Sequence, residues 1–197
     1  MSVITCLAWV KRGYPKQTPT QQHVDLQALQ DSQQLPESDD EDAVPVFAGV
    51  EYDPELEGME DEDKEDMQIE SEDTLLVAGV QNGDMSELHI YVYVESTGAL
   101  YVHHDVIVGA FPISLQWLPY NPTAAATSGN CVAVGSFNPG IEIWDLDVVD
   151  AVEPVSTLGG YKDPSTHFSR KKKKAAKLRK GSHQEAVLSV KLHPLHP

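Results

Sequence analysis

The stretch Ile141-Glu142-Ile143-Trp144-Asp145-Leu146 decides the fold of this chain. Apolar side chains alternate with polar ones along it, which is typical of a β-strand with one buried face. The stretch carries a Trp-Asp pair, the dipeptide that marks the third strand of a propeller blade. It therefore predicts four-stranded sheets, stacked side by side, that form a binding platform.

Seven further apolar runs, separated by Gly, Asn-Gly or Asn-Pro turn signals, also predict strands. They are Val3–Val10, Leu75–Val80, Glu87–Glu95, Ala99–Val108, Phe111–Leu118, Asn130–Phe137 and Pro154–Leu158. The short spacing of these runs after residue 74 favours an all-β fold, because parallel α/β units would need helices between the strands.

A repeated pattern divides the chain into units. The heptapeptides that begin at Ile113 and Leu188 share the order apolar, Ser, apolar, polar, apolar, any, Pro, and Thr5–Trp9 fits the same pattern. We expect about two blades plus one strand of a partial β-propeller with a long disordered acidic insertion. The predicted parts are the first strand of blade one at 1–13, a disordered acidic linker at 14–73, the rest of blade one at 74–110, blade two at 111–160, a basic loop at 161–182 and the first strand of an incomplete third blade at 183–197.

An incomplete third blade leads us to expect a fragment, a splice product or a truncated sequence of a longer propeller. Propellers usually have four to eight blades, and repeats are stabilised largely by their neighbours. Two blades leave apolar faces and strand edges uncovered, so we expect the isolated chain to be marginally stable or prone to aggregation.

The charge of the chain is concentrated in one acidic segment. Between Glu37 and Asp73 there are 18 acidic residues and one lysine, so this segment carries the whole net charge of −17. Three interpretations stay open: a solubilising spacer, a docking surface for histones or ribosomal proteins, and a mask for the basic loop. Ser38, which precedes Asp39-Asp40-Glu41, is a candidate target of an acid-directed kinase.

Eight of the 14 basic residues lie within eleven positions. They are Arg170, Lys171, Lys172, Lys173, Lys174, Lys177, Arg179 and Lys180. A solvated loop is the simplest interpretation; a nuclear or nucleolar localisation signal or a polyanion-binding patch is the alternative. The run contains no aromatic residue, which favours contact with phosphates over stacking on bases.

No pattern of residues predicts catalysis, a cofactor or a metal. Cys6 and Cys131 lie in apolar runs and offer neither a disulfide framework nor zinc spacing. His103 and His104 are adjacent in a predicted strand, where they should point to opposite faces and so not bind one ion. The first ten residues lack the features of a signal peptide, and no apolar run approaches the roughly 18 residues of a membrane span. We expect neither a membrane partner nor a small-molecule substrate.

Beyond the Trp-Asp pair, several strings resemble the periodic tryptophan protein family, a eukaryotic group of WD-repeat proteins. They are Ile4–Val10, Tyr101–Asp105, Pro112–Trp117, Ala133–Gly135, Ile141–Asp150, Glu153–Val155 and Thr157–Gly159, together with the Lys-rich loop. The resemblance implies a nuclear and nucleolar protein in ribosome biogenesis and ribosomal RNA transcription, associated with chromatin, with no catalytic residues. In WD-repeat families a Ser or Thr and a His bind the indole N–H, and Ser136 and His183 are the local counterparts for Trp144 and Asp145.

Two functions follow as hypotheses. The first is a non-enzymatic scaffold that binds ribosome-assembly factors, with the basic loop as a possible contact to phosphate backbones. The second is a histone- or chromatin-binding chaperone that acts through the acidic segment.

Overall fold

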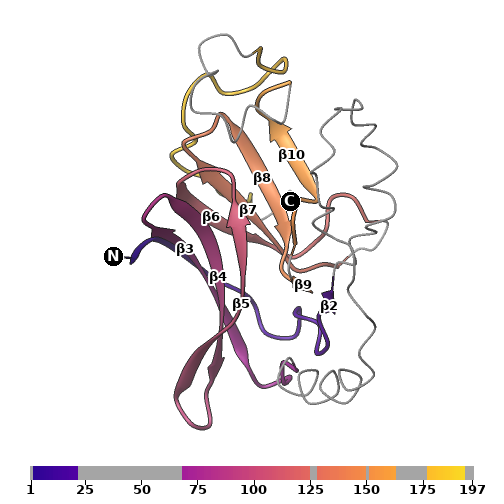
Figure 1. Ribbon diagram of the computed structural model, residues 1–197. Coiled ribbons are helices and arrows are strands. Elements are labelled where there is room, and N and C mark those ends of the chain that lie inside the picture. Colours follow the sequence, from indigo (N-terminus) through magenta and orange to yellow (C-terminus); the bar gives the residue numbers. More distant parts are fainter. Residues whose placement is uncertain (1, 22–67, 125–127, 150, 163–176, 194–197) are drawn as a thin grey trace, which may run out of the picture. The chain divides into compact units, whose positions relative to one another are not determined.

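The computed structural model describes residues 2–21, 68–124, 128–149, 151–162 and 177–193 (Figure 1). These residues form ten strands and no helix: β1 Ser2–Trp9, β2 Thr20–Gln21, β3 Thr74–Asn82, β4 Met85–Val94, β5 Ala99–Val108, β6 Pro112–Leu118, β7 Cys131–Ser136, β8 Gly140–Asp145, β9 Val148–Val149 and β10 Ser156–Gly159. The all-β prediction is confirmed, and every predicted strand up to Leu158 has a counterpart.

Two four-stranded antiparallel sheets contain the long strands. The first sheet has the order β1-β3-β4-β5, and the second has the order β10-β8-β7-β6. Each sheet follows the chain as a meander, except that residues 10–73 separate β1 from β3. In the tight turn between β3 and β4, Gly83 has a φ of 58°, a left-handed conformation that residues with a Cβ rarely adopt.

The two sheets share one hydrophobic core. Leu88, Ile90 and Val92 of β4 cluster with Val134 of β7 and Trp144 of β8. Each of these side chains is almost fully buried, and burying one contributes about 1.5–3 kcal/mol to stability. The alternation of apolar residues in β4 thus arises because one face of the first sheet packs on the second sheet.

The second sheet is buried on both faces, which the alternation in residues 141–146 did not predict. Trp144 points into the shared core, whereas Ile143 belongs to a second cluster with Cys131 and Ala133. Val190 and Leu192 pack against this second cluster. The prediction of one buried face is therefore wrong, because residues distant in sequence cover the other face.

The structure places both ends of the predicted linker, 14–73, in the folded part of the chain. The backbone N–H of Ile69 donates to the carbonyl of Gln17 at 3.0 Å, and Ile69 is buried. Thr20 and Gln21 form β2, which pairs in parallel with β9. Residues 14–21 and 68–73 are therefore attached to the folded part of the chain, and the predicted disordered stretch at 22–67 lies outside the described residues.

The strand predicted at 183–197 is absent from the described residues 183–193. The N–H of Val187 donates to the carbonyl of Ser136 at 2.9 Å, and the N–H of Val190 donates to Ser114 Oγ at 3.0 Å. These two separated bonds hold the segment against the second sheet but do not make a ladder. The repeated pattern thus did not predict the hydrogen bonding of this segment.

Candidate interaction site

The Trp-Asp pair lies where β8 ends. Trp144 is buried, and its Nε1–H donates to the carboxylate of Glu142, two residues earlier on the same face of β8, at 3.2 Å. Ser136 Oγ instead accepts the N–H of Asn138 at 3.2 Å, and His183 is exposed. The expectation that Ser136 and His183 bind the indole is wrong, because Glu142 offers a charged acceptor on the same strand.

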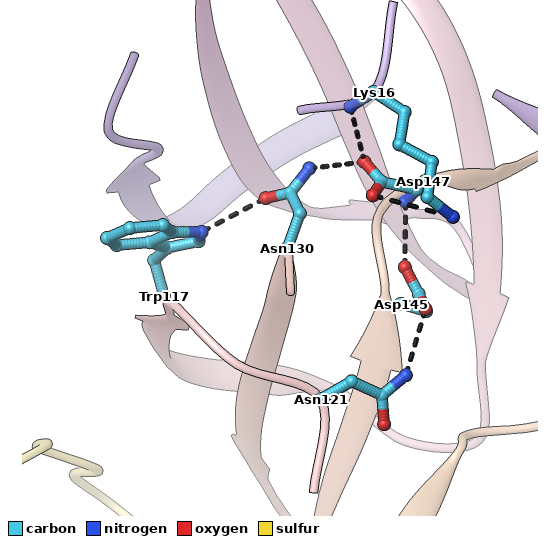
Figure 2. Close-up of polar contacts among 6 residues, drawn as sticks. All are labelled: Lys16, Trp117, Asn121, Asn130, Asp145 and Asp147. Carbon is cyan, nitrogen blue, oxygen red and sulfur yellow. Dashed lines mark hydrogen bonds and ion pairs between the residues drawn. The ribbon is translucent and has the colours of Figure 1, made fainter. Parts of the chain in front are cut away.

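Asp145 begins a chain of polar contacts that continues through Asp147 (Figure 2). One oxygen of Asp145 accepts the N–H of Asp147, and the other accepts the side-chain amide of Asn121, both at 3.0 Å. Asp147 in turn accepts the side-chain amide of Asn130 at 2.8 Å, and Asn130 accepts the indole N–H of Trp117 at 3.0 Å. Asp145 therefore organises the turn after β8.

The same network joins the segment before the acidic stretch to the second sheet. The backbone N–H of Lys16 donates to Asp147 Oδ1 at 3.1 Å, and its Nζ lies 4.0 Å from Asp147 Oδ2. The N–H of Thr20 donates to the carbonyl of Asp147 at 2.8 Å. The sequence did not predict this role of Asp147, since Lys16 and Thr20 are more than a hundred residues away from it. The one local signal was the spacing of two between Asp145 and Asp147.

Burial and charge shift the pKa values of two titratable groups beside this turn. Burial raises the pKa of Asp147, an effect that the hydrogen bonds from Asn130 and Lys16 partly oppose. Burial, together with the nearby carboxylates of Asp145 and Asp147, raises the pKa of the Cys131 thiol to about 12. A thiol with that pKa stays protonated at neutral pH, so Cys131 is a core residue and not a nucleophile.

The two adjacent histidines of β5 contact each other. His103 Nδ1 and His104 Nδ1 are 2.8 Å apart, although neighbours in a regular strand point to opposite faces. The pairing of β4 with β5 shifts between Ile90 and Tyr91 and leaves His103 as an extra residue, a β-bulge that redirects the side chain. The expectation of opposite faces is therefore wrong at this position. Across the described residues, no three His, Cys, Asp or Glu side chains are grouped to hold a metal ion.

The two ends of the basic loop are joined. The N–H of Lys162 donates to the carbonyl of Lys177 at 2.8 Å, and the N–H of Arg179 donates to the carbonyl of Gly160 at 2.9 Å. Lys177, Arg179 and Lys180 are exposed beside this junction. Arg170, the four lysines at 171–174 and Ser38 lie outside the described residues.

The first sheet also has an apolar face that points away from the shared core. Cys6 and Ala8 of β1 pack against the core, so Leu7 and Trp9 lie on the opposite face, where they are 55% and 59% exposed. Ile107 of β5 lies on the same face and is 56% exposed. We call these three residues the outer face of the first sheet. Large apolar side chains that are exposed together on one face of a sheet favour association with another protein.

The fold and the polar network define a class of protein. Consecutive four-stranded antiparallel meanders that stack on a shared core, one with Trp-Asp where its third strand ends, make up part of a WD-repeat β-propeller. In the part of the chain that is described, no helix is long and apolar enough to cross a membrane.

Comparison with known proteins leads to particular homologues. The chain is 34% identical over 160 residues to periodic tryptophan protein 1 of Saccharomyces cerevisiae. The matched region covers 66% of the chain and 28% of that protein. It is 33% identical over 131 residues to the periodic tryptophan protein 1 homolog of Drosophila melanogaster, covering 66% of the chain and 26% of that protein. A WD repeat-containing protein of Schizosaccharomyces pombe is 42% identical over 133 residues, 67% of the chain and 25% of that protein.

These homologues confirm the resemblance and fit a partial β-propeller. The chain spans about a quarter of the length of the curated relatives it matches. No family model matches the chain, and no solved structure matches it. WD-repeat proteins are generally non-enzymatic scaffolds that bind other proteins, and this chain is their homologue.

Proposed function

We propose that this chain is a non-enzymatic scaffold of the nucleus and nucleolus that takes part in ribosome biogenesis and ribosomal RNA transcription. The observation that carries the scaffold role is the use of the Trp-Asp motif: Trp144 is buried on Glu142, and Asp145 and Asp147 hold a turn. These three side chains are bound within the fold. The nucleolar role follows from the resemblance to periodic tryptophan proteins.

The four-stranded sheets bind the partner proteins, and the acidic segment from Glu37 to Asp73 adds recruitment of basic proteins. Its 18 acidic residues and one lysine create a field that attracts ribosome-assembly factors rich in Lys and Arg. Association of this kind is fast and weakens with salt, because exposed charges are screened beyond about 8 Å at physiological ionic strength.

Removal of the acidic segment tests this function. The N–H of Ile69 donates to the carbonyl of Gln17 at 3.0 Å, so the two sides of the segment come close together and a Gly-Ser linker between Gln21 and Gln68 can replace residues 22–67. In affinity purification from nuclear extract, a scaffold keeps most of its partners after this replacement. Loss of every partner would contradict the scaffold proposal.

The same variant tests the second candidate, a histone- or chromatin-binding chaperone. The observation that favours it is the concentration of the whole net charge of −17 in one segment. A chaperone of this kind loses histone binding when the segment is replaced. Purified histones that bind equally well to both proteins would exclude the chaperone function.

The basic run from Arg170 to Lys180 provides the localisation signal and a contact to phosphate backbones. Its cations can neutralise phosphates without reading sequence. A fluorescent fusion in which Lys171–Lys174 are changed to Gln should leave the nucleolus. The matched variant with Arg at the same four positions should stay there, because it keeps the charge.

Phosphorylation of Ser38 strengthens the acidic segment. The phosphate adds about −1.5 to −2 charges next to Asp39 and Asp40, which favours basic partners further. Mass spectrometry of the cellular protein is expected to find phosphate on Ser38. A Ser38 that is unmodified under all growth conditions would remove this part of the proposal.

A further inference from the structure

A turn at residues 179–182 closes the basic loop. Gly181 has a φ of 82°, and the N–H of Ser182 donates back to the carbonyl of Arg179 at 3.2 Å. The chain reverses here, immediately after the last cation of the basic run. Ser182 is thus placed at the base of the loop, next to Gly160 on the other side.

The hydroxyl of Ser182 connects the two sides of this base. Ser182 Oγ lies 2.7 Å from the carbonyl oxygen of Arg179 and 3.2 Å from that of Gly160, and its proton is shared between these two acceptors. The carbonyl of Gly160 also accepts the N–H of Arg179 at 2.9 Å. Ser182 therefore supports the same junction that pairs the incoming and outgoing strands of the loop.

The surroundings of Ser182 are open and cationic. Arg179, Lys180 and Gly181 before it are exposed, as are His183 and Gln184 after it. A Cβ on Gly181 would meet no atom within 4 Å. An enzyme can therefore reach the turn from solvent. It would contact Arg179 three residues before Ser182 and Lys180 two residues before it.

We infer that Ser182 is a phosphorylation site for a serine/threonine kinase with an acidic substrate groove, and that the phosphate opens the base of the basic loop. The carboxylates of such a groove bind Arg179 and Lys180, which places the hydroxyl for transfer. Ser182 Oγ loses its proton to the catalytic carboxylate of the kinase and forms a bond to the γ-phosphorus of MgATP. The bond from that phosphorus to the β–γ bridging oxygen breaks, and ADP leaves.

The phosphate cannot keep the contacts of the hydroxyl. The hydroxyl donates to carbonyl oxygens, whereas phosphate oxygens are acceptors and are repelled by the carbonyls of Arg179 and Gly160. The phosphate also brings about −1.5 to −2 charges to a run of eight cations. Phosphorylation thus opens the base of the loop and lowers the positive charge of the basic run in one step. The Ser182 site does not depend on the proposed nucleolar function. Its kinase recognises basic residues, whereas the kinase expected at Ser38 recognises acidic residues.

Phosphorylation of the purified full chain tests the site. The probe is MgATP with the catalytic subunit of cyclic AMP-dependent protein kinase, a kinase with an acidic groove, and peptide mass spectrometry locates the phosphate. We expect phosphate on Ser182, none at this position in Ser182→Ala, and at least about tenfold slower transfer in Arg179→Gln. The matched controls Ser189→Ala and Lys191→Gln, which change an exposed serine and an exposed lysine nearby, should behave like the unchanged chain.

A second measurement tests the opening. Hydrogen exchange at the N–H groups of Lys162, Arg179 and Ser182 should become about two- to tenfold faster in the phosphorylated chain, the effect of losing one hydrogen bond. Phosphorylation of a synthetic peptide of residues 175–186 but not of the folded chain would overturn the site, because the turn would then shield the hydroxyl. Unchanged exchange at these three groups would overturn the opening.

Discussion

At the scale of single residues, polar side chains in this protein satisfy the indole donors of the second sheet. Trp144 and Trp117 each donate the indole N–H to a side-chain oxygen, one on Glu142 and the other on Asn130. Both contacts satisfy a donor that would otherwise be costly to bury. The Trp-Asp motif is thus a structural device in this chain, and so is the Asn130–Asp147 contact beside it.

Asn130 is the residue of this network whose loss should matter most. Its side chain is buried and bridges the Trp117 indole to Asp147. Asn130→Ala leaves a donor and a buried carboxylate without this partner, so we expect a loss of about 2–4 kcal/mol in the free energy of unfolding, measured by urea denaturation. Asn121→Ala removes a partly exposed contact to Asp145 and should cost less than about 1 kcal/mol. Equal losses in the two variants would contradict this ranking.

His104 should make the stability of the fold sensitive to acid. Burial, with a smaller contribution from His103, lowers its pKa from 6.5 to about 4. Between these pH values the unfolded chain binds a proton that the folded chain does not. The stabilisation that the folded state gains by keeping His104 neutral is complete above pH 6.5 and is lost as the pH falls to about 4. The free energy of unfolding should fall by up to about 3 kcal/mol over this range.

Urea denaturation at pH 7 and pH 4.5 measures this dependence on His104. His104→Leu removes the titrating group and keeps the position apolar, so the difference in unfolding free energy between the two pH values should shrink by about 2 kcal/mol. His183→Gln, a change at an exposed histidine, is the control and should leave that difference as it is. An unchanged pH dependence in His104→Leu would show that His104 does not carry it.

At the scale of elements, alternation of apolar residues predicted the eight long strands, most of their ends to within about two residues. The two short strands β2 and β9 were not predicted, because a two-residue parallel pair has no pattern and depends on Lys16 and Thr20 reaching Asp147. The bulge at His103 was missed for a related reason. A bulge inserts one residue without changing the apolar character of its neighbours.

Gly135 should be essential for the segment that covers the second sheet. A Cβ on Gly135 would lie 2.8 Å from the carbonyl oxygen of Val187 and 3.0 Å from a methyl of Val190. Gly135→Ala therefore forces this segment away from β7, and we expect hydrogen exchange of the Val187 N–H to become at least about tenfold faster. Ser189→Ala changes an exposed side chain in the same segment and should leave that exchange as it is. Slow exchange in Gly135→Ala would mean that the segment does not need this close approach.

At the scale of the whole molecule, the sheets of the folded part differ in how they are covered. The second sheet has packed clusters on both faces, whereas the first sheet packs on one face and exposes Leu7, Trp9 and Ile107 on the other. An exposed apolar face of this kind favours association. That the isolated chain is marginally stable or prone to aggregation stays a prediction.

The double variant Leu7→Lys/Trp9→Lys tests the role of the outer face. Repulsion between the new charges and the loss of apolar surface should reduce self-association, which sedimentation velocity over a range of concentrations measures. Leu188→Lys is the control, since Leu188 is also exposed but lies in the segment after the basic loop. A chain that is monomeric at high concentration before any substitution would contradict the prediction.

The sequence alone determined the eight long strands, their order along the chain and the separation of acidic and basic segments, since alternation and charge are local properties of the chain. The tertiary structure decided which partners the buried polar groups have. Trp144 binds Glu142 rather than Ser136 or His183, and Lys16 binds Asp147 across 131 positions of sequence. The physical reason is packing. Polar groups of distant segments can form hydrogen bonds with each other only after the apolar faces have packed and brought those segments together, and the periodicity of the sequence does not show which segments pack together.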